Sequence, residues 1–252
     1  MGSSDEDEAV LARERRRGRL VGVAGIASVA AMLGAVMLAS AATSGSARPT
    51  GPGFTDEPID RARHLADFHE HAGTHTGSAS LRVLGLVLVA LVGLYLWSLV
   101  RTRDAAVARP YLLWLTVLGP GLVAAATIFG FAALQHVADL FMASGARTTP
   151  RAKQLIDDSG AMRVASVADG LSRIVFAVWL ALLATAAMRV GLLSRFLGYW
   201  GVAGAGSFVL LPIGDAMVAA WVGSIGVLAL GYWPGGRPPA WRSTTPQPVE
   251  AI

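Results

Sequence analysis

Long uncharged runs decide the fold, and the first of them, from Leu20 to Ala42, reads LVGVAGIASVAAMLGAVMLASAA. A helix rises about 1.5 Å per residue, so about 20 apolar residues cross the roughly 30 Å of hydrocarbon in a bilayer. This run is long enough and is predicted to be a membrane-spanning helix. A cleaved signal peptide is the alternative, because arginines precede the run and Ala39-Ser40-Ala41 resembles a cleavage site. The length of the run favours a retained anchor.

The composition points to lipid as the main solvent of the chain. Of the 252 residues, 54% are hydrophobic and 15% are charged, whereas a soluble domain carries about 25% charged residues. The chain contains no cysteine, which excludes a disulfide framework, a cysteine nucleophile and a thiolate metal site. The formal charge of +4 could suggest nucleic acid, but the arginines lie at the ends of apolar runs instead of on one face. We therefore expect no nucleic-acid partner.

The other apolar runs predict an all-α fold, a polytopic transmembrane helix bundle of about six spans. The predicted spans cover residues 20–42, 78–100, 111–134, 166–188, 196–212 and 214–232. The last two runs are joined at Pro212-Ile213-Gly214-Asp215, and each is at the lower end of what crosses a bilayer. A re-entrant pair or a single broken helix is therefore the alternative for this part of the chain.

Polar segments flank and separate the predicted spans. Residues 1–19 form a charged tail with little that could build a core, so we expect it to be frayed or disordered. Residues 233–252 form a proline-rich tail, which we expect to be extended. Two longer polar loops, 43–77 and 135–164, are each predicted to carry a short amphipathic helix. The first helix is expected to begin at Asp56-Glu57-Pro58 and to lie on the membrane surface.

The distribution of arginine predicts the orientation of the bundle. Five arginines precede the first span, and basic residues near a span favour the cytoplasmic side. An even number of spans then returns the C-terminus to the cytoplasm, and the two polar loops lie outside. The tyrosines and tryptophans at the span ends fall on the predicted inner side, the interface they prefer. These aromatic residues are Tyr95, Trp97, Tyr111, Trp114, Tyr199, Trp200, Tyr232 and Trp233.

The most suggestive polar cluster consists of histidines just before the second span. On a helix, His71 and His75 are one turn apart and His64 lies two turns before His71, so three imidazoles could face one zinc, copper or nickel ion. The alternative interpretation is that these histidines occupy the wet face of an interfacial helix and bind no metal. The spacing of the histidines alone, without further groups to orient the imidazoles around a metal, favours this alternative. We therefore predict no cofactor.

Charged residues near the ends of the spans favour structural roles. Asp169 and Arg173 are spaced by four residues and are predicted to pair on one helix face. Asp215, beside a proline and a glycine, is predicted to be a turn residue. The centres of the spans carry no charge, which argues against a proton or ion pump. The glycines of the last two spans, such as Gly201 and Gly223, predict close helix packing.

Two segments resemble a family of small multi-span membrane proteins from actinobacteria, a domain of unknown function. The first, from Ala187 to Gly198, reads AMRVGLLSRFLG, and the second, from Trp233 to Trp241, reads WPGGRPPAW. The resemblance implies a bacterial plasma membrane protein. It implies no catalytic residue, and it does not include the histidine cluster.

The sequence favours a non-enzymatic membrane role, such as a scaffold, an accessory subunit or a protein that binds lipid or small apolar molecules. Its partners would be the lipid bilayer and either further copies of the chain or another membrane protein. A small permease is the second hypothesis. A metal-dependent membrane enzyme that uses His64, His71 and His75 is the third.

Overall fold

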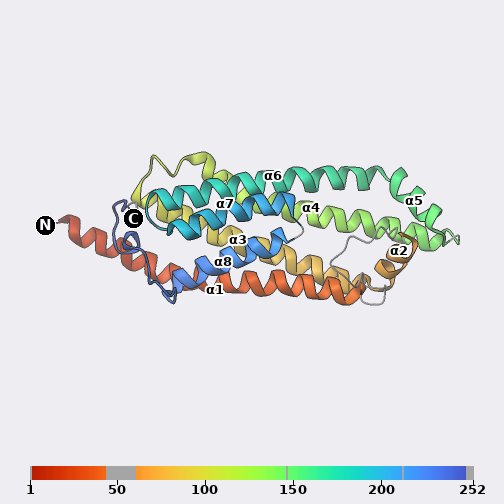
Figure 1. Cartoon of the computed structure of the whole chain (residues 1–252), viewed down its shortest axis with the longest axis horizontal. Coiled ribbons are helices and arrows are strands. Elements are labelled where there is room, and N and C mark those ends of the chain that lie inside the picture. The colour runs from red at the N-terminus through yellow and green to blue at the C-terminus, as the bar shows by residue number, and fades with distance from the viewer. Residues whose placement is uncertain (1, 44–60, 146, 212, 248–252) are drawn as a thin grey trace.

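The computed structural model describes residues 2–43, 61–145, 147–211 and 213–247, and in these ranges the chain is helical without a β-strand. The helices run along the long axis of an elongated bundle (Figure 1). The start of the first helix and the C-terminal segment lie at the same end of the bundle, called the tail end below. The opposite end carries two short helices and is called the far end. The all-α prediction is confirmed for the described residues.

Four helices are long and apolar enough to cross a membrane. The first is the part of α1 (Gly2–Thr43) from Glu6 to Ala41. The others are α3 (Ala72–Arg103), α4 (Pro110–Ala143) and α6 (Gly160–Arg189). Each contains one of the first four predicted spans and extends beyond it. The structure therefore indicates a membrane protein.

The last apolar block forms two shorter helices that pack against each other. α7 (Arg195–Leu210) has 16 residues and α8 (Gly214–Leu230) has 17. At about 1.5 Å per residue, each is about 25 Å long, somewhat less than the roughly 30 Å of hydrocarbon. Both lie in the half of the bundle nearest the tail end (Figure 1). Two helices that pack side by side, rather than one broken helix, therefore form residues 195–210 and 214–230.

The predicted conformation is wrong for residues 2–19 and for part of the C-terminal tail. Residues 2–19 are not frayed but continue α1, because their helix is held by contacts with the rest of the bundle. The C-terminal segment is not extended throughout, since Pro239–Arg242 form the 3-10 helix η1. Ala240 and Trp241 of that turn are buried. Tertiary packing thus orders segments whose composition alone suggested exposure.

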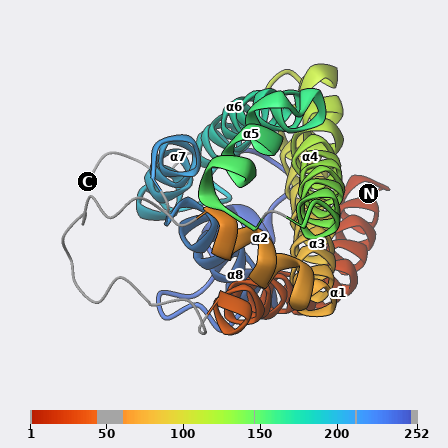
Figure 2. The ribbon, with the colours of Figure 1, turned by 90° about the vertical axis from the view of Figure 1, so that its right-hand side faces the viewer.

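Two short helices cross the far end of the bundle, as Figure 2 shows. α2 (Arg61–Glu70) lies within the first polar loop, and its predicted start at residues 56–58 lies outside the described residues. α5 (Thr149–Asp158) lies within the second loop. Their apolar faces pack against the end of α4 and against each other instead of facing outward. The buried residues of this cluster are Leu65, Phe68, Val137, Ala138, Phe141 and Ala152.

Tryptophan side chains fill the interior of the main bundle. Trp179 is buried, and its indole N–H donates to Thr116 Oγ1 at 3.0 Å. A side chain at Gly93 would collide with the same ring, so glycine is required where α3 passes Trp179. Trp221 is also buried and donates to the Leu197 carbonyl at 2.8 Å. Each indole therefore combines a large apolar surface with a satisfied donor.

Glycines bring helices into close contact, and the prediction of close packing is confirmed at Gly201 and Gly223. The backbones of α1 and α8 meet at Gly25 and Gly226, where an added Cβ would lie 2.9 Å from the opposing Cα. In α7, a Cβ at Gly201 would lie 2.8 Å from the indole nitrogen of Trp221. In α8, a Cβ at Gly223 would lie 2.7 Å from Val29. Small residues thus allow the close approach that stabilises helices in lipid.

Candidate functional site

The C-terminal segment folds back over the tail end of the bundle. The Trp241 indole N–H donates to the Leu192 carbonyl at 2.8 Å, in the turn between α6 and α7. Further along, the Gln247 N–H donates to the Val190 carbonyl at 3.2 Å. Gly191 lies beneath this contact with a φ of 79°, and a side chain there would collide with Gln247. Glycine is therefore required both for the turn and for docking of the segment.

Arg103, at the end of α3, connects three parts of the chain. Its side chain is fully buried, and Nε donates to the Ala240 carbonyl at 2.8 Å. Its two terminal nitrogens contact the carboxylate oxygens of Glu14 in α1 at 3.1 and 2.9 Å. Burial of an arginine is costly unless the charge is paired and its donors are satisfied. Arg103 meets both conditions and thereby joins α1, α3 and η1.

Two further contacts hold the extension of α1. The Tyr95 hydroxyl donates to the Glu14 carbonyl at 3.0 Å, and its ring lies 6.3 Å from that of Trp241. The Thr244 hydroxyl donates to the Asp7 carboxylate at 3.0 Å. Tyr95 is thus buried inside the tail end, whereas the aromatic belt predicted from the sequence would have placed it at the lipid interface. By contrast, Tyr111, Trp114, Tyr199 and Tyr232 are exposed on the sides of the bundle near this end.

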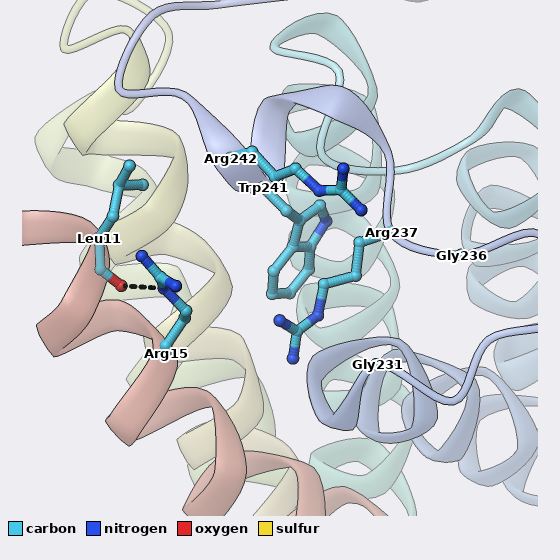
Figure 3. Close-up of a pocket in the computed structure, with 7 residues that line it drawn as sticks. All are labelled: Leu11, Arg15, Gly231, Gly236, Arg237, Trp241 and Arg242. Carbon is cyan, nitrogen blue, oxygen red and sulfur yellow. Dashed lines mark hydrogen bonds between the residues drawn. The ribbon is translucent and has the colours of Figure 1, made fainter. Parts of the chain in front are cut away.

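A pocket of about 480 Å³ opens between α1, the end of α8 and the C-terminal segment. Figure 3 shows the Trp241 ring at its centre, with Arg15 on the α1 side and Arg237 and Arg242 on the side of the C-terminal segment. The residues that line it are Leu11, Arg15, Gly231, Gly236, Arg237, Trp241 and Arg242. Three guanidinium groups from two distant parts of the sequence therefore share one pocket.

Arg237 is fixed in place by the end of α8. Its guanidinium donates to the carbonyls of Leu228, at 3.1 Å, and Ala229. These carbonyls belong to the last turn of the helix, where a cation is favourable because the helix dipole is negative there. The Arg237 guanidinium also lies 5.6 Å from the centre of the Trp241 ring. The chain thus ties one cation of the pocket to both the bundle and the indole.

Carboxylates do not neutralise the pocket in the described parts of the chain. No Asp or Glu side chain there lies within ion-pair distance of Arg15, Arg237 or Arg242. Glu14, the neighbour of Arg15, is already engaged by Arg103. Guanidinium groups that line one pocket without a carboxylate partner favour an anionic ligand, because each offers several donors in a planar fork. The chemistry that this arrangement supports is anion binding.

The histidines singled out by the sequence lie at the far end. The His75 ring stacks on Phe68 with 4.3 Å between centroids, and His64 lies 6.5 Å from the same phenyl ring. His71 Nδ1 lies 3.1 Å from the Asp67 carbonyl. Phe68 thus packs against His64 and His75. Among the described residues, no group of three or more His, Asp or Glu side chains is arranged to hold a metal ion.

Ion pairs lie partway along the bundle, near the turn between α7 and α8. The predicted pair of Asp169 and Arg173 is confirmed, with 2.8 Å between Oδ2 and Nε. Asp215, predicted to be a turn residue, instead lies in the first turn of α8 and pairs with Arg82 of α3 at 3.2 Å. Nothing in the local sequence pairs these two residues, because 133 positions separate them.

Sequence analysis missed the residues that build the pocket. Arg15 was interpreted as one of the arginines that set the topology. Arg237 and Trp241 lay in the proline-rich tail, within a segment that carries the family resemblance. The signal that could have found them is an aromatic residue next to arginines in a terminal segment, which is also common in disordered tails.

Comparisons with known proteins locate the bundle within a family but leave most of the pocket outside it. No curated protein and no solved structure matches the chain. One family matches residues 23–233, and of the residues lining the pocket only Gly231 falls in that range. This match covers most of the chain, which therefore belongs to the family described as a domain of unknown function, DUF4386.

Proposed function

We propose that this chain is a six-span protein of a bacterial plasma membrane, of the actinobacterial type its sequence resembles, with both termini in the cytoplasm. Its role is non-enzymatic: it binds a lipid or small molecule at the tail end, as a binding protein, scaffold or accessory subunit. The observation that carries this proposal is the pocket that Arg15, Arg237 and Arg242 line without a neutralising carboxylate among the described residues.

The spacing of charged residues along the helices supports six spans. On α3, Arg82 and Arg103 are separated by about 31 Å at 1.5 Å per residue, close to the thickness of the hydrocarbon. α7 ends and α8 begins near the level of Arg82, since Asp215 in the first turn of α8 pairs with Arg82. At the same level, Arg173 donates to the carbonyl of Phe208 near the end of α7 at 3.3 Å. Long side chains at this level can reach water from the edge of the hydrocarbon.

In this arrangement the far end extends beyond the membrane on the outside. α3 begins ten residues before Arg82, and α6 begins thirteen residues before Arg173. These extensions, together with α2 and α5, form a helical cap at the outer surface. The short helices lie over the end of the bundle and bury their apolar faces in it. The cytoplasmic side is the tail end, where arginines flank α1 and the loops between α3 and α4 and between α6 and α7.

Retention of the first span is supported by its packing. α1 contacts both α3 and α8, and Met32 and Ala35 of α1 are buried. Gly22 and Gly25 bring the α1 backbone into close contact with Gly226 of α8. Cleavage near Ala42 would remove this helix and expose the faces of α3 and α8 that it covers. A retained helix is therefore part of the proposed bundle.

The filled interior favours binding over transport. A permease of this size would need a polar cavity near the middle of the membrane. From the level of Arg173 to the middle of the bundle, the interior is packed with Trp179, Trp221 and Leu183, each no more than 1% exposed. A small permease is retained as the alternative function, and solute flux is the property that distinguishes it.

The proposal is tested by what copurifies with the chain from its native membrane. The tag-free protein is extracted in a mild detergent, and its bound lipids, small molecules and protein partners are identified by native mass spectrometry. We expect a bound anionic molecule or partner that is retained by the wild type and lost in W241A, which removes the centre of the pocket. Protein-dependent solute uptake by reconstituted vesicles, with no bound species, would replace this proposal with the permease.

A further inference from the structure

We propose that the pocket at the tail end binds a phosphate ester, either the headgroup of an anionic phospholipid or a soluble organic phosphate. This inference rests on the proposed function and specifies its ligand. It follows from the donors that remain available in the pocket, from the charge around them and from the level of the pocket relative to the membrane.

The arginines of the pocket retain donors that nothing else uses in the described chain. Arg15 engages only Nε, which donates to the Leu11 carbonyl of its own helix at 3.4 Å. Arg237 engages Nε and Nη2 and leaves Nη1 without a partner among the described residues. Arg242 has no side-chain partner there and is exposed. Guanidinium groups match the spacing of phosphate oxygens and bind them through paired hydrogen bonds.

The charges around the pocket favour a ligand that carries its own negative charge. The Glu14 carboxylate accepts from both terminal nitrogens of Arg103 and faces that buried arginine. Asp7 accepts from Thr244. The three cations of the pocket are therefore left to a ligand. A phosphate ester carries one or two negative charges and several acceptor oxygens, which suits a pocket lined by three arginines better than a single carboxylate would.

The level of the pocket suits both sources of phosphate. Gly231 follows the last residue of α8, and Tyr232 and Trp233 next to it are residue types that prefer the interface. Leu11 and Arg15 precede the apolar run of α1 by one to three turns, about 7 to 14 Å. The pocket thus begins at the headgroup layer and opens toward the cytoplasm. A volume of about 480 Å³ accommodates a phosphate with its glycerol or sugar.

The test measures binding to the purified full chain in a neutral detergent by isothermal titration calorimetry. The probes are short-chain phosphatidylglycerol, glycerol phosphate, and a diacylglycerol of the same chain length that lacks phosphate. The main variant is R15Q/R242Q, because these two side chains contribute least to the packing of the bundle. The matched control is R109Q, since Arg109 is an exposed arginine in the turn between α3 and α4 at the same end and does not line the pocket.

We expect at least one phosphate-bearing probe to bind and diacylglycerol not to bind. Binding should weaken about tenfold for each arginine removed, as is typical of a charge-assisted hydrogen bond, and should be unchanged in R109Q. Preference for phosphatidylglycerol over glycerol phosphate identifies a lipid headgroup as the ligand, and equal or stronger binding of glycerol phosphate identifies a soluble ester. Should R15Q/R242Q fail to fold, R15K/R242K keeps the charge but loses the fork, and it should still bind more weakly than the wild type.

Absence of binding by both phosphate-bearing probes, or equal losses in R15Q/R242Q and R109Q, would overturn the inference. If the tail end nevertheless faces the cytoplasm, such a result contradicts only the phosphate site and leaves the proposed function standing. A tail end exposed outside the cell would instead contradict the proposed function itself, so the two failures are distinguishable.

Discussion

The two ends of the bundle use charged residues in different ways. At the tail end, one fully buried arginine, Arg103, joins α1, α3 and the C-terminal segment through a paired contact with Glu14. Toward the far end, the ion pairs are partly exposed. The side chains of Arg82 in α3 and Asp215 in α8, for example, are 26% and 33% exposed. Loss of one partner of a buried ion pair strongly destabilises a protein, whereas an exposed ion pair contributes little to the free energy of unfolding.

This difference implies that the tail end depends on a single connection, whereas the far end depends on apolar packing. Arg103 and Glu14 order the segments that form the pocket, so loss of either should affect both stability and binding. At the far end, the cluster around Leu65 and Phe141 holds α2 and α5 in place, and the polar residues there contribute less.

The largest effect is expected from R103M. The substitution removes the buried cation, leaves the Glu14 carboxylate without its partner and deprives the Ala240 carbonyl of a donor. We expect a loss of about 3 to 5 kcal/mol in the free energy of unfolding, measured by chemical denaturation in detergent. The matched control is R101M, two residues earlier on the same helix, where the exposed guanidinium lies over Trp97. Similar small losses in both variants would show that the buried connection is unimportant.

A local effect is expected from W241A. The indole is buried and donates to the Leu192 carbonyl, so its removal should weaken docking of the C-terminal segment by about 3 kcal/mol. Limited proteolysis should then cleave residues 234–247 faster than in the wild type while the bundle stays intact. Y232A serves as the control because Tyr232 is 79% exposed. An unchanged cleavage rate in W241A would contradict the docking contact.

A smaller effect is expected for the pair of Arg82 and Asp215. Because both side chains are partly exposed, a double-mutant cycle with R82Q and D215N should give a coupling energy of about 1 kcal/mol or less. The pair of Asp169 and Arg173, one turn apart on α6, should couple by about 0.5 kcal/mol. A coupling energy above about 3 kcal/mol between Arg82 and Asp215 would mean that this pair is effectively buried. The contrast with the buried pair at the tail end would then be wrong.

The smallest effect is expected at the exposed histidines. Replacing His64, His71 and His75 together with Gln should change the free energy of unfolding by about 0.5 kcal/mol or less at the exposed His64 and His71. The loss should be about 1 kcal/mol at His75, which stacks on Phe68. Metal content of the tag-free protein should be unchanged. The metal-dependent alternative would be supported if the wild type held near-stoichiometric zinc, copper or nickel. The triple variant would then lose the metal and melt several degrees lower.

Local patterns predicted the helices and the pair of Asp169 and Arg173, because apolar runs and spacing by one turn are properties of short sequence windows. Contacts between distant segments could not be predicted in this way. The pairing of Arg82 with Asp215 and the docking of Trp241 depend on how the helices pack. The same limit explains the wrong prediction for residues 2–19, whose charged sequence suggested a frayed tail until contacts with Tyr95 and Arg103 ordered it.

The central claim is that the arginine-rich tail end faces the cytoplasm and that six helices separate it from the outside. The most direct measurement is labelling of single-cysteine variants with a membrane-impermeant maleimide, which the absence of native cysteine permits. K153C, in α5, and I213C, in the turn between α7 and α8, should be labelled in intact cells. T244C should be labelled only after permeabilisation. Labelling of T244C in intact cells would contradict the orientation, and protection of I213C with labelling of K153C would reduce the bundle to four spans with a re-entrant pair.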